Sequence, residues 1–257
     1  MEHGHALLLR VLQERRPDWV RRRGVRMLEI GTTREELPEQ DSTRVLSEFC
    51  QQHGWSFTTC DMDPANSDRA RELFVRMGEP FEAVTAKGED YVATGRRRFD
   101  TVYLDAYDFD HGQHSEARQE RYEAHLGSRI NQHACEVMHL ETMQGLTKSG
   151  ASRCLVVLDD TWRDDPDGPW QGKGPLAIPW ALTHGWELTE EDPNHRAVVL
   201  EKIAPAYVLL TERAKRAVRD RRRALRRKRR TLERRRNKRR RQQARRRAAQ
   251  ADGRAVR

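Results

Sequence analysis

The sequence predicts an α/β protein: a doubly wound, mostly parallel seven-stranded sheet with an antiparallel last strand. Three observations lead to this fold class. Short apolar runs alternate with segments whose apolar residues recur every three or four positions, as strands alternating with helices do. Four such strand–helix units and a fifth strand imply parallel pairing through right-handed crossovers. The last two apolar runs are joined only by a short turn, so they must pair antiparallel.

Each expected strand is a short apolar or β-branched run that ends in turn-forming residues. The first ends at Gly31, the second is followed by Asp61 to Pro64, and Asp192-Pro193-Asn194 separates the last two. The seven runs are residues 25–31, 55–60, 81–86, 99–104, 154–158, 186–190 and 197–203. Helical spacing of apolar residues predicts helices within residues 43–53, 65–77, 115–147 and 176–183.

Charge divides the chain into an acidic body and a basic tail. The 257 residues carry a formal net charge of +9. Residues 211–257 hold 24 basic and four acidic residues, a net charge of +20, so the preceding residues carry a net charge of −11. We predict an N-terminal helical segment (1–24), an α/β domain (25–204) and an Arg-rich tail (205–257) that is helical or disordered.

Composition argues against several classes of protein. No apolar run approaches the ~18 residues of a membrane span, and the polar N-terminus does not resemble a secretory signal. The cysteines are scattered without paired spacing, which argues against a disulfide framework or a zinc knuckle; they are Cys50, Cys60, Cys135 and Cys154. We therefore expect a cytoplasmic protein without a transmembrane segment.

Acidic residues follow five consecutive predicted strands. In an open parallel sheet, ligands bind outside the carboxyl ends of the strands, where the strand order reverses. One acid at such a position is ordinary surface, whereas acids at five strand ends predict a site. The residues concerned are Glu29 with Gly31, then Asp61, Glu89 with Asp90, Asp105, and Asp159 with Asp160.

The order of elements, together with Leu28-Glu29-Ile30-Gly31, resembles a class I S-adenosylmethionine-dependent methyltransferase of Rossmann-like fold. The resemblance covers about residues 26–203. It implies that the backbone of Gly31 approaches the methionine part of the cofactor and that Glu29 pairs with its ammonium group. Thr32-Thr33-Arg34 follows where the family usually has more glycine.

Two further segments carry the resemblance toward the adenosine part of the cofactor. Cys60-Asp61-Met62-Asp63-Pro64 resembles the motif in which an acid accepts both ribose hydroxyls and an apolar residue packs on the adenine, implying these roles for Asp61 and Met62. Gly88-Glu89-Asp90 resembles the motif near the adenine amine, which implies a contact by Glu89. The alternatives are a turn at Asp61 to Pro64 and a helix N-terminus at Glu89.

Tyr103-Leu104-Asp105 and Val157-Leu158-Asp159-Asp160 together resemble the metal-dependent small-molecule O-methyltransferases of the catechol and macrolide-sugar types. This resemblance implies that Asp105, Asp159 and Asp160 hold Mg²⁺ or another divalent cation, with Asp105 also lining the cofactor pocket. The ion would lower the pKa of an acceptor hydroxyl. In the alternative interpretation Asp159 caps a helix and Asp105 only lines the pocket.

The general base is a less definite prediction. His111 and His114 follow the fourth strand closely, and a histidine could take the acceptor's proton; exposed loop histidines are the alternative. Residues 162–174, rich in Trp and Gly, suit a lid, and Lys173 is a basic residue there that could meet an anionic acceptor.

Three functions fit the sequence. The first is metal-assisted O-methylation of a small hydroxylated acceptor. The second is a nucleic-acid methyltransferase anchored by residues 211–257, although the Asn-Pro-Pro-aromatic signature is absent and Asp105-Ala106-Tyr107-Asp108 stands in its place. The third is a non-catalytic polyanion-binding protein. The basic tail suits RNA or DNA, an anionic membrane surface, or the acidic body of a second copy, which would give a homo-oligomer, and the sequence does not separate these partners.

Overall fold

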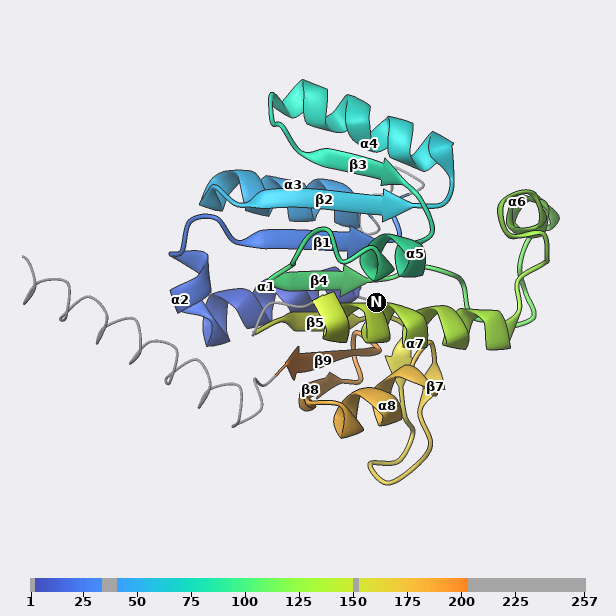
Figure 1. The fold of residues 1–257 in the computed structure, drawn as a ribbon. Coiled ribbons are helices and arrows are strands. Elements are labelled where there is room, and N and C mark those ends of the chain that lie inside the picture. Colours follow the sequence, from blue (N-terminus) through green and yellow to red (C-terminus); the bar gives the residue numbers. More distant parts are fainter. Residues whose placement is uncertain (1–2, 34–40, 150–152, 203–257) are drawn as a thin grey trace, which may run out of the picture. The chain divides into compact units, whose positions relative to one another are not determined.

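The computed structural model describes residues 3–33, 41–149 and 153–202. Its seven-stranded sheet has the order β3-β2-β1-β4-β5-β9-β8 (Figure 1). The strands are β1 (Arg26–Ile30), β2 (Ser56–Asp61), β3 (Glu82–Thr85), β4 (Thr101–Leu104), β5 (Leu155–Leu158), β8 (Trp186–Asp192) and β9 (Ala197–Lys202). The first five pair in parallel, and β9 is antiparallel to both β5 and β8. The predicted fold class is therefore confirmed.

Helices cover both faces of the sheet. One layer contains α1 (Gly4–Arg15), α2 (Pro17–Val20), α3 (Ser42–His53) and α4 (Pro64–Met77). The other contains α5 (Gly88–Ala93), α7 (Gln132–Ser149) and α8 (Ala177–Thr183). Helix α6 (Glu116–Leu126) lies beyond the carboxyl ends of the strands (Figure 1). The predicted helical segment 115–147 is thus two helices, because Gly127 ends the first in the left-handed conformation.

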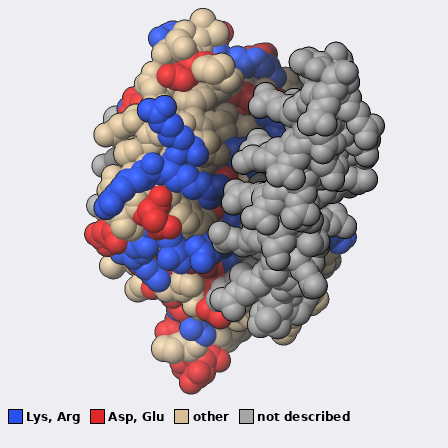
Figure 2. Space-filling view, turned by 60° about the vertical axis from the view of Figure 1, so that its left-hand side comes forward, with Lys and Arg blue, Asp and Glu red and all other residues tan. Residues whose placement is uncertain are grey.

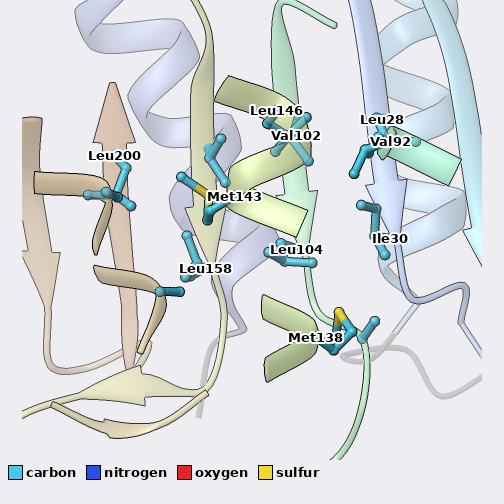
Figure 3. Close-up of a cluster of buried hydrophobic side chains, with 14 of the residues drawn as sticks. Leu28, Ile30, Val92, Val102, Leu104, Met138, Met143, Leu146, Leu158 and Leu200 are labelled. Atoms are coloured by element: carbon cyan, nitrogen blue, oxygen red, sulfur yellow. The ribbon is translucent and has the colours of Figure 1, made fainter. Parts of the chain in front are cut away.

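Two hydrophobic clusters fix these layers, and strand periodicity decides which residue joins which. In β1, Leu28 and Ile30 pack toward α5 and α7, whereas Met27 packs toward α1 and α3. Figure 3 shows the first cluster, where Met138 and Met143 of α7 meet the central strands. Burial on both faces explains why the central strands β1, β4, β5 and β9 are apolar runs in the sequence.

The N-terminal helix α1 belongs to this packing. Leu7, Leu8, Val11 and Leu12 are fully buried, and the helix contacts β4, β5 and β9. Its first residue, Gly4, therefore reaches the carboxyl edge of β5.

The segment predicted to be a lid forms a small hairpin. Strands β6 (Thr161–Trp162) and β7 (Gln171–Gly172) pair antiparallel, and β6 follows the tip of β5 after Asp160. Within the described ranges, no helix is long and apolar enough to cross a bilayer. The Arg-rich tail lies outside the described residues, and its predicted boundary at residue 205 stays a prediction.

Candidate cofactor and acceptor site

The strand order reverses between β1 and β4. From β1 the sheet grows through β2 to β3 on one side, and β4 then pairs with the other side of β1. The carboxyl ends of these strands lie on the right-hand side of Figure 1. The loops after β1, β2 and β4 therefore surround one place, which is where an open α/β sheet binds its ligand.

Gly31 directly follows β1, and its position requires a glycine. Its φ is +101°, and a Cβ atom there would lie 2.2 Å from the backbone oxygen of Asp105. The loop after β1 thus passes in close contact with the loop after β4. This contact leaves the backbone at Gly31 as a wall of the cleft.

Asp61 ends β2 with its carboxylate held by two backbone amides. The Thr32 N–H donates to Oδ2 at 3.0 Å, and the Asp63 N–H donates to Oδ1 at 2.8 Å. Asp63 in turn caps α4 by accepting a hydrogen bond from Ala65 N–H at 2.9 Å. The turn interpretation of Asp61 to Pro64 is therefore correct in geometry, and the turn also aims Asp61 along the edge of the sheet.

A cleft opens between these loops and α6. The predicted residues Gly31, Asp61 and Met62 all line it. Its remaining lining is Ile30, Cys60, Asp63, Asn66, Gly88, Ala106, Tyr107, Arg121 and Tyr122. Gly88 belongs to the segment that resembles the third motif. The structure thus brings together residues from all three segments that carry the resemblance to the cofactor-binding motifs.

Glu89 does not line this cleft directly. Its Oε1 accepts a hydrogen bond from the Tyr107 hydroxyl at 3.1 Å, and Tyr107 does line the cleft. Burial raises the pKa of Glu89. Its neighbour Asp90 is exposed. The hydrogen bond to Tyr107 therefore links Glu89 to the cleft.

Glu29 lies beneath the cleft rather than in it. It is fully buried, and its carboxylate accepts hydrogen bonds from Ser42 (2.6 Å), Thr43 (2.8 Å) and Thr59 (2.7 Å). Burial raises its pKa to about 7, against the lowering effect of those hydroxyls. A direct contact would require a ligand's ammonium group to reach a fully buried carboxylate that three hydroxyls already engage. In this structure Glu29 ties the start of α3 to β1 and β2.

A second cavity, of about 260 Å³, adjoins the first at Gly31. Four carboxylates line it, those of Asp105, Asp108, Asp159 and Asp160, whereas Arg118 supplies its one guanidinium. The remaining lining is His3, His5, Gly31, Thr32, Thr33, Ser42 and Tyr103. The cavity is therefore small, polar and rich in acids.

The three predicted metal ligands do come together at this cavity. The Tyr103 hydroxyl donates to Asp159 and lies 3.4 Å from Oδ2 of Asp105. Asp159 is nearly fully buried, and the Gly4 N–H donates to its two oxygens at 3.2 and 3.3 Å. Burial raises the pKa of Asp159, and so does repulsion from Asp105 and Asp160.

The cation among these acids is Lys173. Its ammonium group forms ion pairs with Asp105 and with Oδ2 of Asp160, the latter at 3.0 Å. Only 2 % of the side chain is exposed. Burial lowers the pKa of Lys173, but the carboxylates of Asp105 and Asp160 raise it to a net value well above the ordinary one.

The residues present do not fit a divalent metal. Within residues 3–33, 41–149 and 153–202, no group of three or more His, Cys, Asp or Glu side chains is arranged to hold a metal ion. The ammonium group of Lys173 is paired with two of the three acids on which the magnesium prediction depends. The sequence motif correctly placed the acids together but could not show what lies between them.

The predicted bases His111 and His114 lie outside both cavities. Their rings are 3.8 Å apart, and His114 Nε2 lies 3.0 Å from the backbone oxygen of Phe109. Sequence reasoning missed His5, which is buried beside Tyr103 at the second cavity. Burial, followed by repulsion from His3, lowers the pKa of His5 to about 4. No local signal marks His5, because only the docking of α1 brings it there.

Comparison with known proteins gives a fold likeness only. No family model matches the sequence, and no curated protein matches it. Among solved structures, the chain resembles TrmN from Thermus thermophilus at 15% identity and a TM-score of 0.47, covering 77% of this chain and 48% of TrmN. It also resembles the T. thermophilus 16S rRNA N2 G1207 methyltransferase RsmC, solved with AdoMet and guanosine, at 15% identity and a TM-score of 0.48, covering 79% of this chain and 43% of RsmC. The chain thus spans about half the length of these proteins, and the likeness assigns no activity.

Proposed function

We propose that the chain is a class I S-adenosylmethionine-dependent methyltransferase that acts on a small hydroxylated acceptor. The observation that carries this proposal is the cleft at the strand-order reversal. There Gly31, Asp61 and Met62 converge, and two amide donors orient the Asp61 carboxylate. Each of the three has the chemistry that the sequence motifs require of it.

In this proposal the cleft, which has a volume of about 20 Å³ in this structure, opens to hold the adenosine part of the cofactor. Asp61 accepts both ribose hydroxyls, because an ionised carboxylate can accept two hydrogen bonds at once. Met62 packs against the adenine, and Tyr107 covers the cleft from the loop after β4. The backbone at Gly31 then directs the sulfonium toward the second cavity, since Gly31 lines both.

The second cavity supports a small acceptor rather than a nucleic acid. Its volume of about 260 Å³ suits a small molecule, and its carboxylates outnumber the cations Lys173 and Arg118, which disfavours phosphate. Methyl transfer by in-line displacement needs mainly orientation of the acceptor oxygen against the methyl group. The predicted bases His111 and His114 lie outside this cavity, so no proton acceptor is assigned, and no step is assigned to a metal.

Photo-crosslinking tests where the cofactor binds. Ultraviolet irradiation of the full chain with methyl-labelled S-adenosylmethionine, followed by peptide mapping, should place the label in peptides that contain Asp61 to Asn66 or Tyr107 to Tyr122. S-adenosylhomocysteine should compete for labelling, and ATP should not. Label confined to residues 203–257, or labelling that S-adenosylhomocysteine leaves unchanged, contradicts the proposal.

A second candidate function, anchoring to a polyanion, is supported by a basic edge on the folded body. Two exposed triplets, Arg21 to Arg23 and Arg96 to Arg98, lie where the parallel strands begin. Arg98 is near enough to lower the pKa of Lys202, although burial is the larger cause. Figure 2 shows Lys and Arg gathered on the face turned forward from the left of Figure 1. The Arg-rich tail follows Lys202 in sequence and would add its own positive charge to the binding of a polyanion.

A further inference from the structure

Lys173 is an unusual lysine because it is buried among carboxylates at the edge of a cavity. An ammonium group removed from water is stable only when it is paired and hydrogen-bonded. Asp105 and Asp160 supply that pairing from the tips of two neighbouring strands, β4 and β5. The side chain therefore links the two strand ends across the candidate site.

The backbone around Lys173 is built to deliver this side chain. The Lys173 N–H donates to the backbone oxygen of Asp160 at 2.9 Å, and Gln132 Nε2 donates to the backbone oxygen of Gly172 at 2.8 Å. Gly172 has a φ of +68°, and a Cβ there would lie 1.9 Å from the Asp160 oxygen. Only glycine allows the hairpin to approach the tip of β5 so closely. Lys173 is thus held by its main chain as well as by its ion pairs.

Asp160 also pays a conformational cost to take part. Its φ is +47°, a left-handed conformation that a residue other than glycine adopts at a cost. In that conformation its carboxylate meets Lys173, while its N–H donates to Oδ1 of Asp159 at 2.9 Å. The strained residue is thus the one that connects the ammonium group to the third acid.

We propose that Lys173 is the resident cation of this site, a positioning residue that takes the place of a divalent metal and leaves the site independent of metal. Its single positive charge fixes Asp105 beside the cofactor cleft. Even with Arg118 counted and Asp159 protonated, Lys173 leaves the cavity with more carboxylates than cations, so we expect neutral or cationic hydroxylated acceptors rather than phosphorylated or carboxylated ones. The inference about the acceptor class rests on the proposed methyltransferase function, whereas the inference that no metal binds does not.

Titration with Mn²⁺ alone tests the claim that the site needs no metal. The full chain is first treated with a chelator, and bound Mn²⁺ is then detected by electron paramagnetic resonance. At about 1 mM Mn²⁺, the wild type should bind no Mn²⁺ at this site, so Asp160→Asn should leave its signal unchanged. Lys173→Ala, which deletes the ammonium group and leaves space, should bind Mn²⁺ at least about tenfold more tightly than the wild type does. Lys173→Met also deletes the charge but fills the space, so it should gain less. Adding Asp160→Asn to Lys173→Ala should remove the gain.

Two results overturn the proposal: wild-type Mn²⁺ binding that depends on Asp160, or a folded Lys173→Ala variant with no gain. Near-UV circular dichroism establishes whether the variant is folded, and the wild-type titration decides the matter by itself if the variant is not. A parallel titration of S-adenosylmethionine with EDTA or with Mg²⁺ should give the same affinity. If the wild type binds neither S-adenosylmethionine nor Mn²⁺, the proposed function is rejected, but the inference that the site holds no metal stands.

The acceptor claim is tested by competition within one chemical series. Once an acceptor is found, the KM for its phosphorylated derivative should be at least about tenfold higher than the KM for the acceptor itself, and the KM for an amino derivative should not be raised. In Lys173→Met the loss should fall on kcat more than on KM, because Lys173 acts through Asp105. A phosphorylated acceptor that is used equally well would contradict this part.

Discussion

Gly31 couples a single residue's conformation to the shape of the cleft. Gly24 also has a positive φ, of +75°, but a Cβ there would meet nothing within 4 Å, whereas at Gly31 it would meet the backbone of Asp105. Gly24→Ala should cost about 1 kcal/mol in free energy of unfolding, from conformation alone. Gly31→Ala should cost more than about 3 kcal/mol, because the backbone must also move. Urea unfolding of the two variants measures the difference, and equal costs would contradict the close approach.

Glu29 should make stability depend on pH in a defined direction. Its pKa is raised from 4.5 to about 7 in the folded protein, so the folded state binds more protons than the unfolded state between these values. Stability contributed by Glu29 is therefore present below pH ~4.5 and is lost as pH rises toward 7, by on the order of 3 kcal/mol. Glu29→Gln should remove that dependence.

Urea unfolding at several pH values measures this effect as the difference between wild type and Glu29→Gln. Other groups cancel in that difference, including His5 and His139, whose lowered pKa values make stability rise with pH. The Gln variant should gain on the wild type as pH increases from about 5 to 7.5. A difference that stays constant across this range would show that Glu29 titrates normally.

Residue roles were only partly predictable from the sequence. Asp61 and Met62 follow a strand in a recognisable motif, and the structure places both in the cleft. In β1, Glu29 points to the same face of the sheet as Met27, which packs toward α3. The alternation of side chains along β1 therefore directs Glu29 away from the cleft. Lys173 reaches Asp105 only through tertiary packing, which no local pattern records.

At the scale of elements, helix α1 is part of the folded domain and helps to close the second cavity. Leu8 is fully buried and its neighbour Leu9 only partly so, which makes them a matched pair. Leu8→Ala should cost about 2–5 kcal/mol in free energy of unfolding, and Leu9→Ala roughly 1 kcal/mol or less. Thermal unfolding compares the two variants. If both are nearly neutral, α1 does not contribute to the core.

Element types were predictable where one signal dominates. The central strands β1, β4, β5 and β9 are mostly buried on both faces and are apolar runs, whereas the edge strands β3 and β8 are only partly buried; all seven were expected. The hairpin β6–β7 was expected only as a loop, because two-residue strands carry too few residues to show a period. The docking of α1 was likewise beyond periodicity, which shows an apolar face but not its partner.

At the scale of the whole molecule, the proposed cofactor cleft and the basic edge lie at opposite ends of the parallel strands. A polyanion bound at the edge would anchor the protein without entering the cleft. Full-length chain should bind duplex RNA with steep salt dependence, and replacing Arg21 to Arg23 by Ser should flatten the log–log salt slope by about 2–3. Arg129→Ser, near α6, is the control and should change the slope by less than about 1. Fluorescence anisotropy at several salt concentrations measures both, and unchanged slopes would remove the basic edge from the binding surface.

Isothermal titration of S-adenosylmethionine into the full chain measures whether Asp61 binds the cofactor. Binding should weaken by about 10–100-fold in Asp61→Ala, since a carboxylate that accepts hydrogen bonds from two ribose hydroxyls is lost. Asp68→Ala, an exposed acid on the adjoining helix α4, should bind as the wild type does. A folded wild-type chain that binds no S-adenosylmethionine, or an Asp61→Ala variant that binds it equally well, would contradict the account.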